Sequence, residues 1–147
     1  MKERFETFTV LINRINRNIK KIKNREMAEY NLRSAHVSCL YYIYRNKGAT
    51  ATDLCERCEE DKATISRALD YLEKNEFITR EANVSKRYKS PLILTQKGSD
   101  VGKRIADKID HVLSLISGGL TEGERVAFYR SLSIVSESLE QCVKNNK

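Results

Sequence analysis

Four side chains in the first half of the chain have a spacing that suits metal binding. His36 and Cys39 stand three positions apart, Cys55 and Cys58 do the same, and fifteen residues separate the two pairs. Zinc sites are built from such pairs. Cysteine also packs well as a small apolar side chain in a helical core. We expect core packing without a bound metal or cofactor, and this spacing leaves a metal- or thiol-responsive regulator open as an alternative.

The sequence offers no recognisable set of catalytic residues. Its only histidines are His36 and His111, no glycine-rich phosphate loop follows a predicted strand, and no pair of acidic residues stands in an active-site motif. We therefore expect a protein that is not an enzyme.

The segment 61–77, DKATISRALDYLEKNEF, has two different faces when it is read as a helix. Ile65, Leu69 and Leu72 form an apolar stripe. The other face is small, hydroxyl-bearing and basic, which lets a helix enter the major groove of DNA and reach bases or phosphates. A merely solvated face is the alternative. The residues expected to contact DNA here are Lys62, Ala63, Thr64, Ser66, Arg67 and Lys74, and Asp70 is placed to hold the Arg67 side chain.

A short helix is predicted just before this segment. Thr50 can cap it, with Asp53 three residues on, and Leu54 faces inward. Only two or three residues separate this helix from the one that Asp61 is expected to cap. A short helix, a tight turn and a longer helix form a helix-turn-helix.

A cationic hairpin is predicted after the second helix. Phe77–Arg80 and Leu92–Leu94 are expected to form short strands around a charged loop. Positive charges at such a tip suit the electronegative minor groove and the phosphates of DNA. A helix-turn-helix followed by a hairpin is a winged helix. The residues expected to contact DNA from this wing are Lys86, Arg87, Tyr88 and Lys89.

Three long segments carry apolar stripes at helical spacing, in residues 5–22, 101–116 and 128–142, and the spacings alternate between three and four in the first and the last. Thr121 and Glu124 stand in capping-box relation ahead of the last one. Seams of this length suit helices that pack against other helices. We expect the two ends of the chain to build a dimerisation lobe, and an intrachain bundle is the alternative.

The predicted fold is mainly α with a small β-wing, in which a winged helix-turn-helix DNA-binding lobe stands on a helical dimerisation lobe. We divide the chain into an N-terminal dimerisation helix in 1–33, a winged helix-turn-helix region in 34–97 and C-terminal dimerisation helices in 98–147.

The charge of the chain favours a polyanionic partner. The formal net charge is +7, and residues 62–104 carry ten basic and five acidic side chains. No apolar run reaches the roughly 20 residues that a membrane span needs, and the N-terminus lacks a signal core. We expect a cytoplasmic protein that does not enter a membrane and whose four cysteines, Cys142 included, are reduced thiols.

Four short motifs between about Ala35 and Gly98 follow one another in a specific order and spacing. They are Gly48-x-Thr50-x-x-Asp53-Leu54, Asp61-Lys62-Ala63-Thr64-Ile65-Ser66-Arg67, Leu69-Asp70-x-Leu72-Glu73-Lys74 and Leu94-Thr95-x-Lys97-Gly98. They resemble the MarR family of dimeric winged-helix regulators, and the flanking helices fit its dimerisation lobe by position. The resemblance implies a homodimeric transcriptional regulator, most simply a repressor, that binds a pseudo-palindromic site in double-stranded DNA. A dimeric winged-helix module that binds protein is the alternative.

The sequence departs from the family pattern in three places. The family usually has glycine in the helix-turn-helix turn and after the recognition helix, where this chain has Glu59 and Glu76. We therefore expect Asn75 to take the left-handed turn. The family's wing usually carries Asp-x-Arg, whereas this wing reads Lys-Arg-Tyr at 86–88. The expected minor-groove arginine is Arg87.

The family commonly binds a small, often anionic aromatic molecule in a cleft between the two lobes. Four tyrosines fall near the junction where this cleft is expected, and they are also compatible with core packing. The resemblance thus implies a small aromatic or anionic effector near Tyr30, Tyr41, Tyr42 and Tyr44.

Overall fold

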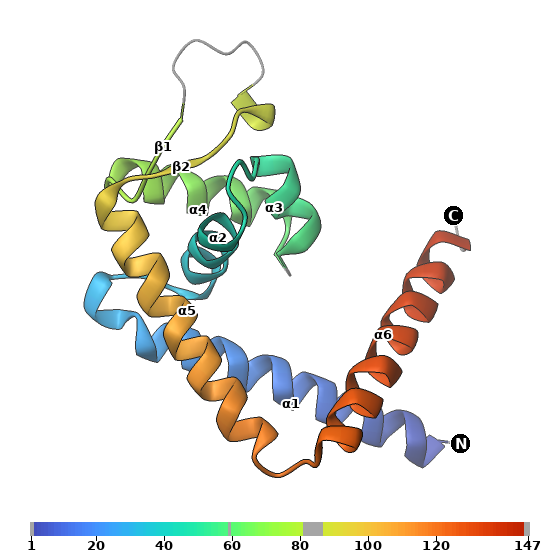
Figure 1. Ribbon diagram of the computed structural model, residues 1–147. Coiled ribbons are helices and arrows are strands. Elements are labelled where there is room, and N and C mark those ends of the chain that lie inside the picture. The colour runs from blue at the N-terminus through green and yellow to red at the C-terminus, as the bar shows by residue number, and fades with distance from the viewer. Residues whose placement is uncertain (1, 59, 81–86, 146–147) are drawn as a thin grey trace. The chain divides into compact units, whose positions relative to one another are not determined.

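The computed structural model describes residues 2–58, 60–80 and 87–145, with residues 2, 3 and 87 described by their backbone only. The described part is mostly helical with one small sheet, so the expected fold class is confirmed (Figure 1). The elements in chain order are α1 (Lys2–Glu26), η1 (Ala28–Tyr30), α2 (Ser34–Arg45), α3 (Ala51–Arg57), α4 (Lys62–Lys74), β1 (Ile78–Thr79), η2 (Arg87–Lys89), β2 (Ile93–Leu94), α5 (Gln96–Ser117) and α6 (Glu122–Asn145).

The chain divides into two compact units, Met1–Lys108 and Ile109–Lys147. The first unit holds every described element from α1 to the first half of α5. The second holds the rest of α5 and all of α6. The assignment of the two chain ends to a dimerisation lobe stays a prediction.

The core of the first unit lies where α4 packs against α2 and α3. The stripe predicted on α4 is buried, because Ile65, Leu69 and Leu72 are each at most 1% exposed. Removing such side chains from water is the main favourable contribution to folding. These contacts leave the opposite face of α4 to solvent. The facing apolar side chains include Val37, Leu40 and Ile43 of α2 and Leu54 of α3.

The predicted cap at Thr50 is confirmed. Its hydroxyl accepts the backbone N–H of Asp53 at 3.2 Å, and an Asp53 carboxylate oxygen accepts the backbone N–H of Thr50 at 2.8 Å. These reciprocal bonds satisfy donors that a helix start leaves free. The bonds from Thr50 also hold the pKa of Asp53 below its ordinary value, so the cap stays charged at neutral pH. This fixes where α3 begins.

The sheet pairs β1 with β2 antiparallel, with Ile78 opposite Leu94 and Thr79 opposite Ile93. Both strands are shorter than the sequence predicted. Gly98 on α5 closes the hairpin, since a Cβ there would lie 1.8 Å from the carbonyl oxygen of Phe77. Only glycine permits this close backbone approach. The glycine of the last motif is therefore required by packing between α5 and the end of α4.

The long helices leave apolar side chains exposed in the single chain. The capping box that starts α6 is confirmed, because the hydroxyl of Thr121 accepts the backbone N–H of Glu124 at 3.3 Å and the Glu124 carboxylate accepts that of Thr121 at 2.8 Å. No described helix is apolar over a length sufficient to cross a bilayer. The large exposed apolar residues of the two chain ends are Phe5, Phe8, Val10, Leu11, Ile12, Ile15 and Ile19 on α1, and Val126, Phe128, Tyr129, Leu132, Ile134, Val135, Leu139 and Val143 on α6.

Candidate nucleic-acid interface

Asp61 caps the start of α4, as the sequence predicted. Its carboxylate accepts the backbone N–H of Thr64 at 2.8 Å and the Thr64 hydroxyl at 3.0 Å. These bonds hold the pKa of Asp61 below its ordinary value, so the carboxylate is charged at neutral pH. A negative cap also interacts favourably with the positive end of the helix dipole. The first turn of α4 is thereby held in helical form.

The polar face of α4 is open to solvent. Lys62, Ala63, Ser66 and Arg67 are exposed in its first two turns, and Lys74 is exposed in its last. Thr64 is half-buried, and its hydroxyl accepts a hydrogen bond from Arg67 Nη2 at 3.2 Å. This bond orients the guanidinium along the helix. The structure thus brings all the expected residues of α4 to one accessible face.

The expected pairing of Asp70 with Arg67 is wrong. Asp70 instead lies 3.5 Å from Nη2 of Arg80, whose Nε is 3.3 Å from a carboxylate oxygen of Glu73. The Arg80 side chain is only 9% exposed. It stands just after β1, and the two carboxylates stand one turn apart on α4, so this cluster ties the hairpin to the helix. The role of Arg80 was not predicted from the sequence. Asp70 and Glu73 stand three positions apart on one side of the helix, and this spacing could have indicated a cation between them.

The end of α4 also differs from the sequence prediction. Glu76, with φ of +60°, takes the left-handed conformation, whereas Asn75 has φ of −96°. The N–H of Phe77 bonds to the Leu72 carbonyl at 2.9 Å, and that of Glu76 to the Glu73 carbonyl at 3.1 Å. These two bonds define a Schellman motif, whose left-handed residue is the second one past the helix. Asn75 precedes this position by one residue, so it does not take the left-handed conformation.

The wing lies partly outside the described residues. Lys86 falls outside them, and Arg87 is described only as the first residue of η2. Tyr88 is 53% exposed, and Lys89 Nζ lies 6.0 Å from the centre of its ring. The hydroxyl of Thr52 on α3 donates to the Tyr88 carbonyl at 3.2 Å. This bond fixes η2 against the helix-turn-helix, a contact that nothing in the sequence signalled.

A ring stack joins α4 to α2. His36 of α2 and Tyr71 of α4 are 4.2 Å apart between ring centres and only 10° from parallel. The Tyr71 hydroxyl donates to the Asn31 carbonyl at 2.9 Å. His36 Nδ1 accepts the backbone N–H of Arg33 at 3.0 Å. The contacts of His36 are thus with Tyr71 and Arg33, and they help to position α4.

Two of the three cysteines of the nominal metal motif, Cys39 and Cys58, belong to the core. Cys39 is fully buried, Cys58 is 7% exposed, and Cys55 is half-buried. Within the described ranges, no three histidine, cysteine or acidic side chains are arranged to hold a metal ion. The interaction with the Cys58 side chain, and then burial, raise the pKa of the Cys39 thiol.

The four tyrosines lie in different surroundings. Tyr30 is hydrogen-bonded to Arg104 of α5, and Tyr41 and Tyr42 meet edge to face with ring centres 5.8 Å apart. Tyr42 borders a pocket of about 210 Å³. Tyr44 packs against Gly102 and borders a different pocket of about 490 Å³. The structure thus brings the rings of Tyr41 and Tyr42 into contact, and Tyr42 and Tyr44 border different pockets.

The comparisons with known proteins agree with this geometry. A family model described as MarR family matches residues 30–87. The chain is 26% identical over 130 residues to the uncharacterized HTH-type transcriptional regulator YybA of Bacillus subtilis, covering 88% of this chain and 87% of the relative.

Solved structures with the same fold include two that contain DNA. One is a proposed MarR family regulator from Listeria monocytogenes in complex with a 26-mer DNA, with TM-score 0.78, 29% identity and coverage of 87% of this chain and 85% of that one. The other is a complex of MepR from Staphylococcus aureus with DNA, with TM-score 0.79, 19% identity and coverage of 90% and 97%. The structure named MarR has TM-score 0.72 and 29% identity, and the match covers 91% of both chains. With its buried helix-turn-helix core and exposed face on α4, this chain has the fold of the MarR-family transcriptional regulators, and its residues 30–87 match that family.

Proposed function

We propose that the chain represses transcription by binding a pseudo-palindromic site in double-stranded DNA as a homodimer. The observation that carries this proposal is the accessible polar face at the start of α4, where Lys62, Ala63, Ser66 and Arg67 are exposed. Small side chains at a helix start permit close approach to the major groove, and the lysine and arginine supply contacts to phosphates and bases. The similar regulator from Listeria monocytogenes, crystallised with DNA, supports this use of the fold.

The dimer proposal rests on the exposed apolar faces of the long helices. Phe5 is 70% exposed on α1, and Val126 and Val143 are 62% and 67% exposed on α6. Apolar faces of this extent mark interaction surfaces. Burial against a second copy gives a two-fold symmetric pair, in which two copies of α4 reach major grooves about one turn, ~34 Å, apart. Occupying such a site in a promoter blocks access to it.

Selection of bound sequences from a random DNA pool tests the proposal. We expect an enriched site with two inverted half-sites. Titration of a duplex at several salt concentrations adds a second test, because each phosphate contact contributes about −0.9 to the slope of log K against log salt. A protein-binding module would enrich no sequence and show a shallow slope, and that result would refute DNA recognition.

We also propose that a small aromatic anion binds as an effector in the pocket of about 490 Å³ that Tyr44 borders. Tyr44 and Ile43 of α2 border this pocket together with Lys47, and its other wall is β2 and the start of α5. An aromatic ring can pack on Tyr44 while its carboxylate pairs with Lys47. A ligand here contacts the base of the wing, and it shifts DNA occupancy only by its differential affinity for two conformations.

Benzoate titration followed by calorimetry tests the effector site. We expect binding that Lys47→Met weakens, while Lys103→Met on the exposed side of α5 leaves it unchanged. Equal binding by both variants would exclude this pocket as the effector site without touching the DNA-binding proposal.

A further inference from the structure

The connector between α1 and α2 is compact and held by several backbone hydrogen bonds. It runs from residue 27 to residue 33 and contains η1. Met27 and Leu32 are buried, and the N–H of Leu32 donates to the Met27 carbonyl at 3.2 Å. Asn31 has a φ of +58°, and its N–H donates to the Ala28 carbonyl at 2.9 Å. The connector is therefore a defined turn and not an extended linker.

The helices on both sides of this connector are bonded to each other and to α5. The backbone N–H of Ser34, the first residue of α2, donates to Oδ1 of Asn24 on α1 at 2.7 Å. Lys108 of α5 donates to the Glu26 carbonyl at the end of α1 at 3.0 Å, and its Nζ lies 3.2 Å from the Glu26 carboxylate. The last carbonyls of a helix have no partner within the helix, so Lys108 satisfies one of them. The end of α1 is thereby fixed to the start of α2.

Tyr71 connects α4 to this joint. Its hydroxyl donates to the Asn31 carbonyl at 2.9 Å. Its ring stacks on the ring of His36 near the start of α2, with 4.2 Å between the ring centres. Tyr71 follows Arg67 by four positions, about one helical turn. One side chain of α4 thus bonds to the connector that follows α1 and also packs against α2.

The position of α4 relative to α1 decides how far apart two copies of α4 stand in the proposed dimer. Helix α1 carries a large exposed apolar face, which the proposed dimer buries against a second copy. Each added base pair moves a half-site by about 3.4 Å along the duplex and turns it by about 34° around the axis. A firm connection between α1 and α4 therefore accepts one spacing of the half-sites, whereas a loose connection accepts several.

We propose that Tyr71 is a positioning residue that determines which spacing between half-sites the dimer accepts. Its hydroxyl fixes α4 to the connector after α1, and its ring fixes α4 to α2. The inference rests on the proposed homodimer with inverted half-sites, and it names the contact that restricts their spacing.

A series of duplexes with altered spacing tests the proposal. Tyr71→Phe removes the hydroxyl and keeps the ring, so it isolates the bond to Asn31. The selected half-sites are placed at the selected spacing and at spacings one or two base pairs shorter or longer. We expect the parent to lose at least about tenfold in affinity when the spacing changes by one base pair, because the second half-site is then out of reach. In Tyr71→Phe we expect this loss to shrink to about threefold, because a loosely held α4 reaches both positions.

The shape of the spacing profile separates positioning from stability. A residue that only stabilises the fold would, when changed, weaken binding by the same factor at every spacing. Affinity for a duplex with a single half-site is expected to change less than about twofold in Tyr71→Phe, since the side chains that contact DNA are unchanged. Urea unfolding of the same variant measures its stability separately.

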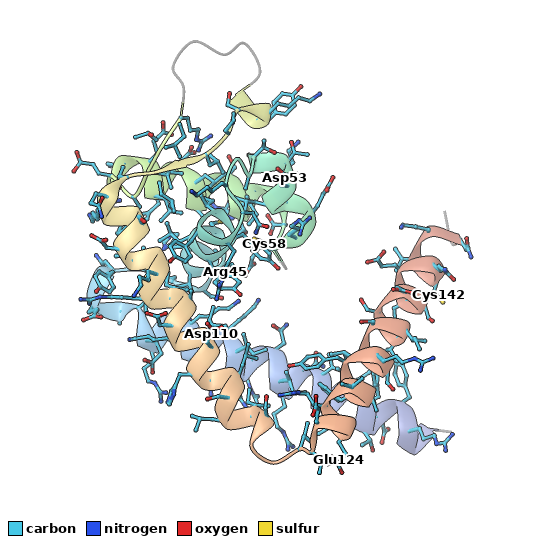
Figure 2. All side chains as sticks on the ribbon, viewed as in Figure 1. Arg45, Asp53, Cys58, Asp110, Glu124 and Cys142 are labelled. Carbon is cyan, nitrogen blue, oxygen red and sulfur yellow. The ribbon has the colours of Figure 1, made fainter. Side chains whose placement is uncertain are left out.

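Tyr41→Phe is the matched control, because it removes the same atom from a tyrosine on α2. The ring of Tyr41 contacts Tyr42, and Cζ of Arg45 lies 5.7 Å from the centre of the Tyr41 ring. Figure 2 labels Arg45. We expect Tyr41→Phe to keep the parental spacing profile. Tyr71→Leu removes the ring stack as well as the hydroxyl, and we expect a broader profile than that of Tyr71→Phe.

Amide hydrogen exchange in the absence of DNA tests the joint itself. We expect the amides of residues 27–33 to exchange at least about threefold faster in Tyr71→Phe, because local opening no longer breaks the bond from Tyr71. The amides of α6 are expected to keep their parental rates and serve as the internal reference. In Tyr41→Phe both segments are expected to exchange as in the parent.

A parental spacing profile in Tyr71→Phe overturns the proposal, and so does an equal loss of affinity at every spacing. Unchanged exchange in residues 27–33 overturns the role of the hydroxyl in the joint. If selection yields no inverted half-sites, the proposed function fails together with the spacing role, whereas the exchange data still decide whether Tyr71 holds the connector. Tyr71→Phe decides these questions even if Tyr71→Leu does not fold.

Discussion

The Nε atom of Arg80 lies 3.3 Å from a carboxylate oxygen of Glu73 and so joins the end of β1 to helix α4. The same guanidinium reaches Asp70 at 3.5 Å. The first strand of the hairpin and helix α4 are therefore joined by one side chain. We expect changes at this cluster to alter how α4 is presented as well as how stable the fold is.

Arg80→Gln is expected to lower the free energy of unfolding by about 1–2 kcal/mol, because it removes charge-assisted contacts of a nearly buried guanidinium. Urea unfolding followed by circular dichroism measures this loss. Lys103→Gln is the control, since Lys103 pairs with Asp107 at 3.5 Å on an exposed surface and both side chains are about two-thirds exposed. Such a pair contributes at most about 0.5 kcal/mol. Equal losses in the two variants would contradict the role of Arg80.

Arg67→Ala is expected to cost about 1–3 kcal/mol on the selected DNA site and to relax its base preference, because Arg67 is held on the open face of α4 by Thr64. Arg87→Ala is expected to weaken binding more evenly across sequences. Lys74→Ala serves as a phosphate-contact comparison, with a salt slope smaller by about one. Competition between selected and random duplexes measures each variant. Parental affinity in both arginine variants would show that the surface is wrongly assigned.

Glu76→Gly is expected to raise the free energy of unfolding by about 1 kcal/mol. Glu76 holds a positive φ of 60°, which disfavours a residue with a Cβ and suits glycine. Asn75→Gly is the control, because Asn75 has φ of −96° and its side chain donates to the Tyr71 carbonyl at 2.8 Å. We expect that change to destabilise the chain. Thermal and urea unfolding distinguish the two, and a gain at position 75 instead would contradict the Schellman assignment.

The free energy of unfolding is expected to decrease as the pH is lowered and His36 becomes protonated. Burial, and then the charge of Arg33, lower the pKa of His36 from 6.5. The unfolded chain therefore takes up the proton more readily, so the contribution of His36 is complete above pH 6.5 and is lost as pH falls through the lowered pKa. Protonation also removes the acceptor that bonds the Arg33 N–H.

His36→Phe keeps an aromatic ring against Tyr71 and removes the titration. We expect the urea midpoint of this variant to vary less between pH 7.5 and 5.5 than that of the parent, although its stability at pH 7.5 is lower. His111→Gln, at an exposed position on α5, is expected to retain the parental pH dependence. A parental slope in His36→Phe would show that other groups cause the decline.

Local patterns in the sequence were sufficient to predict the helices, their caps and the helix-turn-helix. Asp61 and Thr50 cap their helices as predicted, and the stripe of Ile65, Leu69 and Leu72 is buried. These features depend on residues within one or two turns of each other, where spacing alone decides which groups meet. The same patterns placed the expected α4 contacts on one face.

Long-range partners were decided only by the tertiary structure. Asp70 pairs with Arg80, whereas its spacing in the sequence predicted a pair with Arg67. The ring of His36 stacks on Tyr71, whereas its spacing suggested a site shared with the cysteines. The left-handed residue after α4 was set by hydrogen bonds from Glu76 and Phe77 back into the helix, so it fell on glutamate despite its side chain. A side chain's partner depends on which elements pack together in space, and one-dimensional spacing does not contain that information. For this protein the sequence by itself determined the elements and the family pattern, and the packing of α2, α3, β1 and α4 decided which residues hold α4 in place.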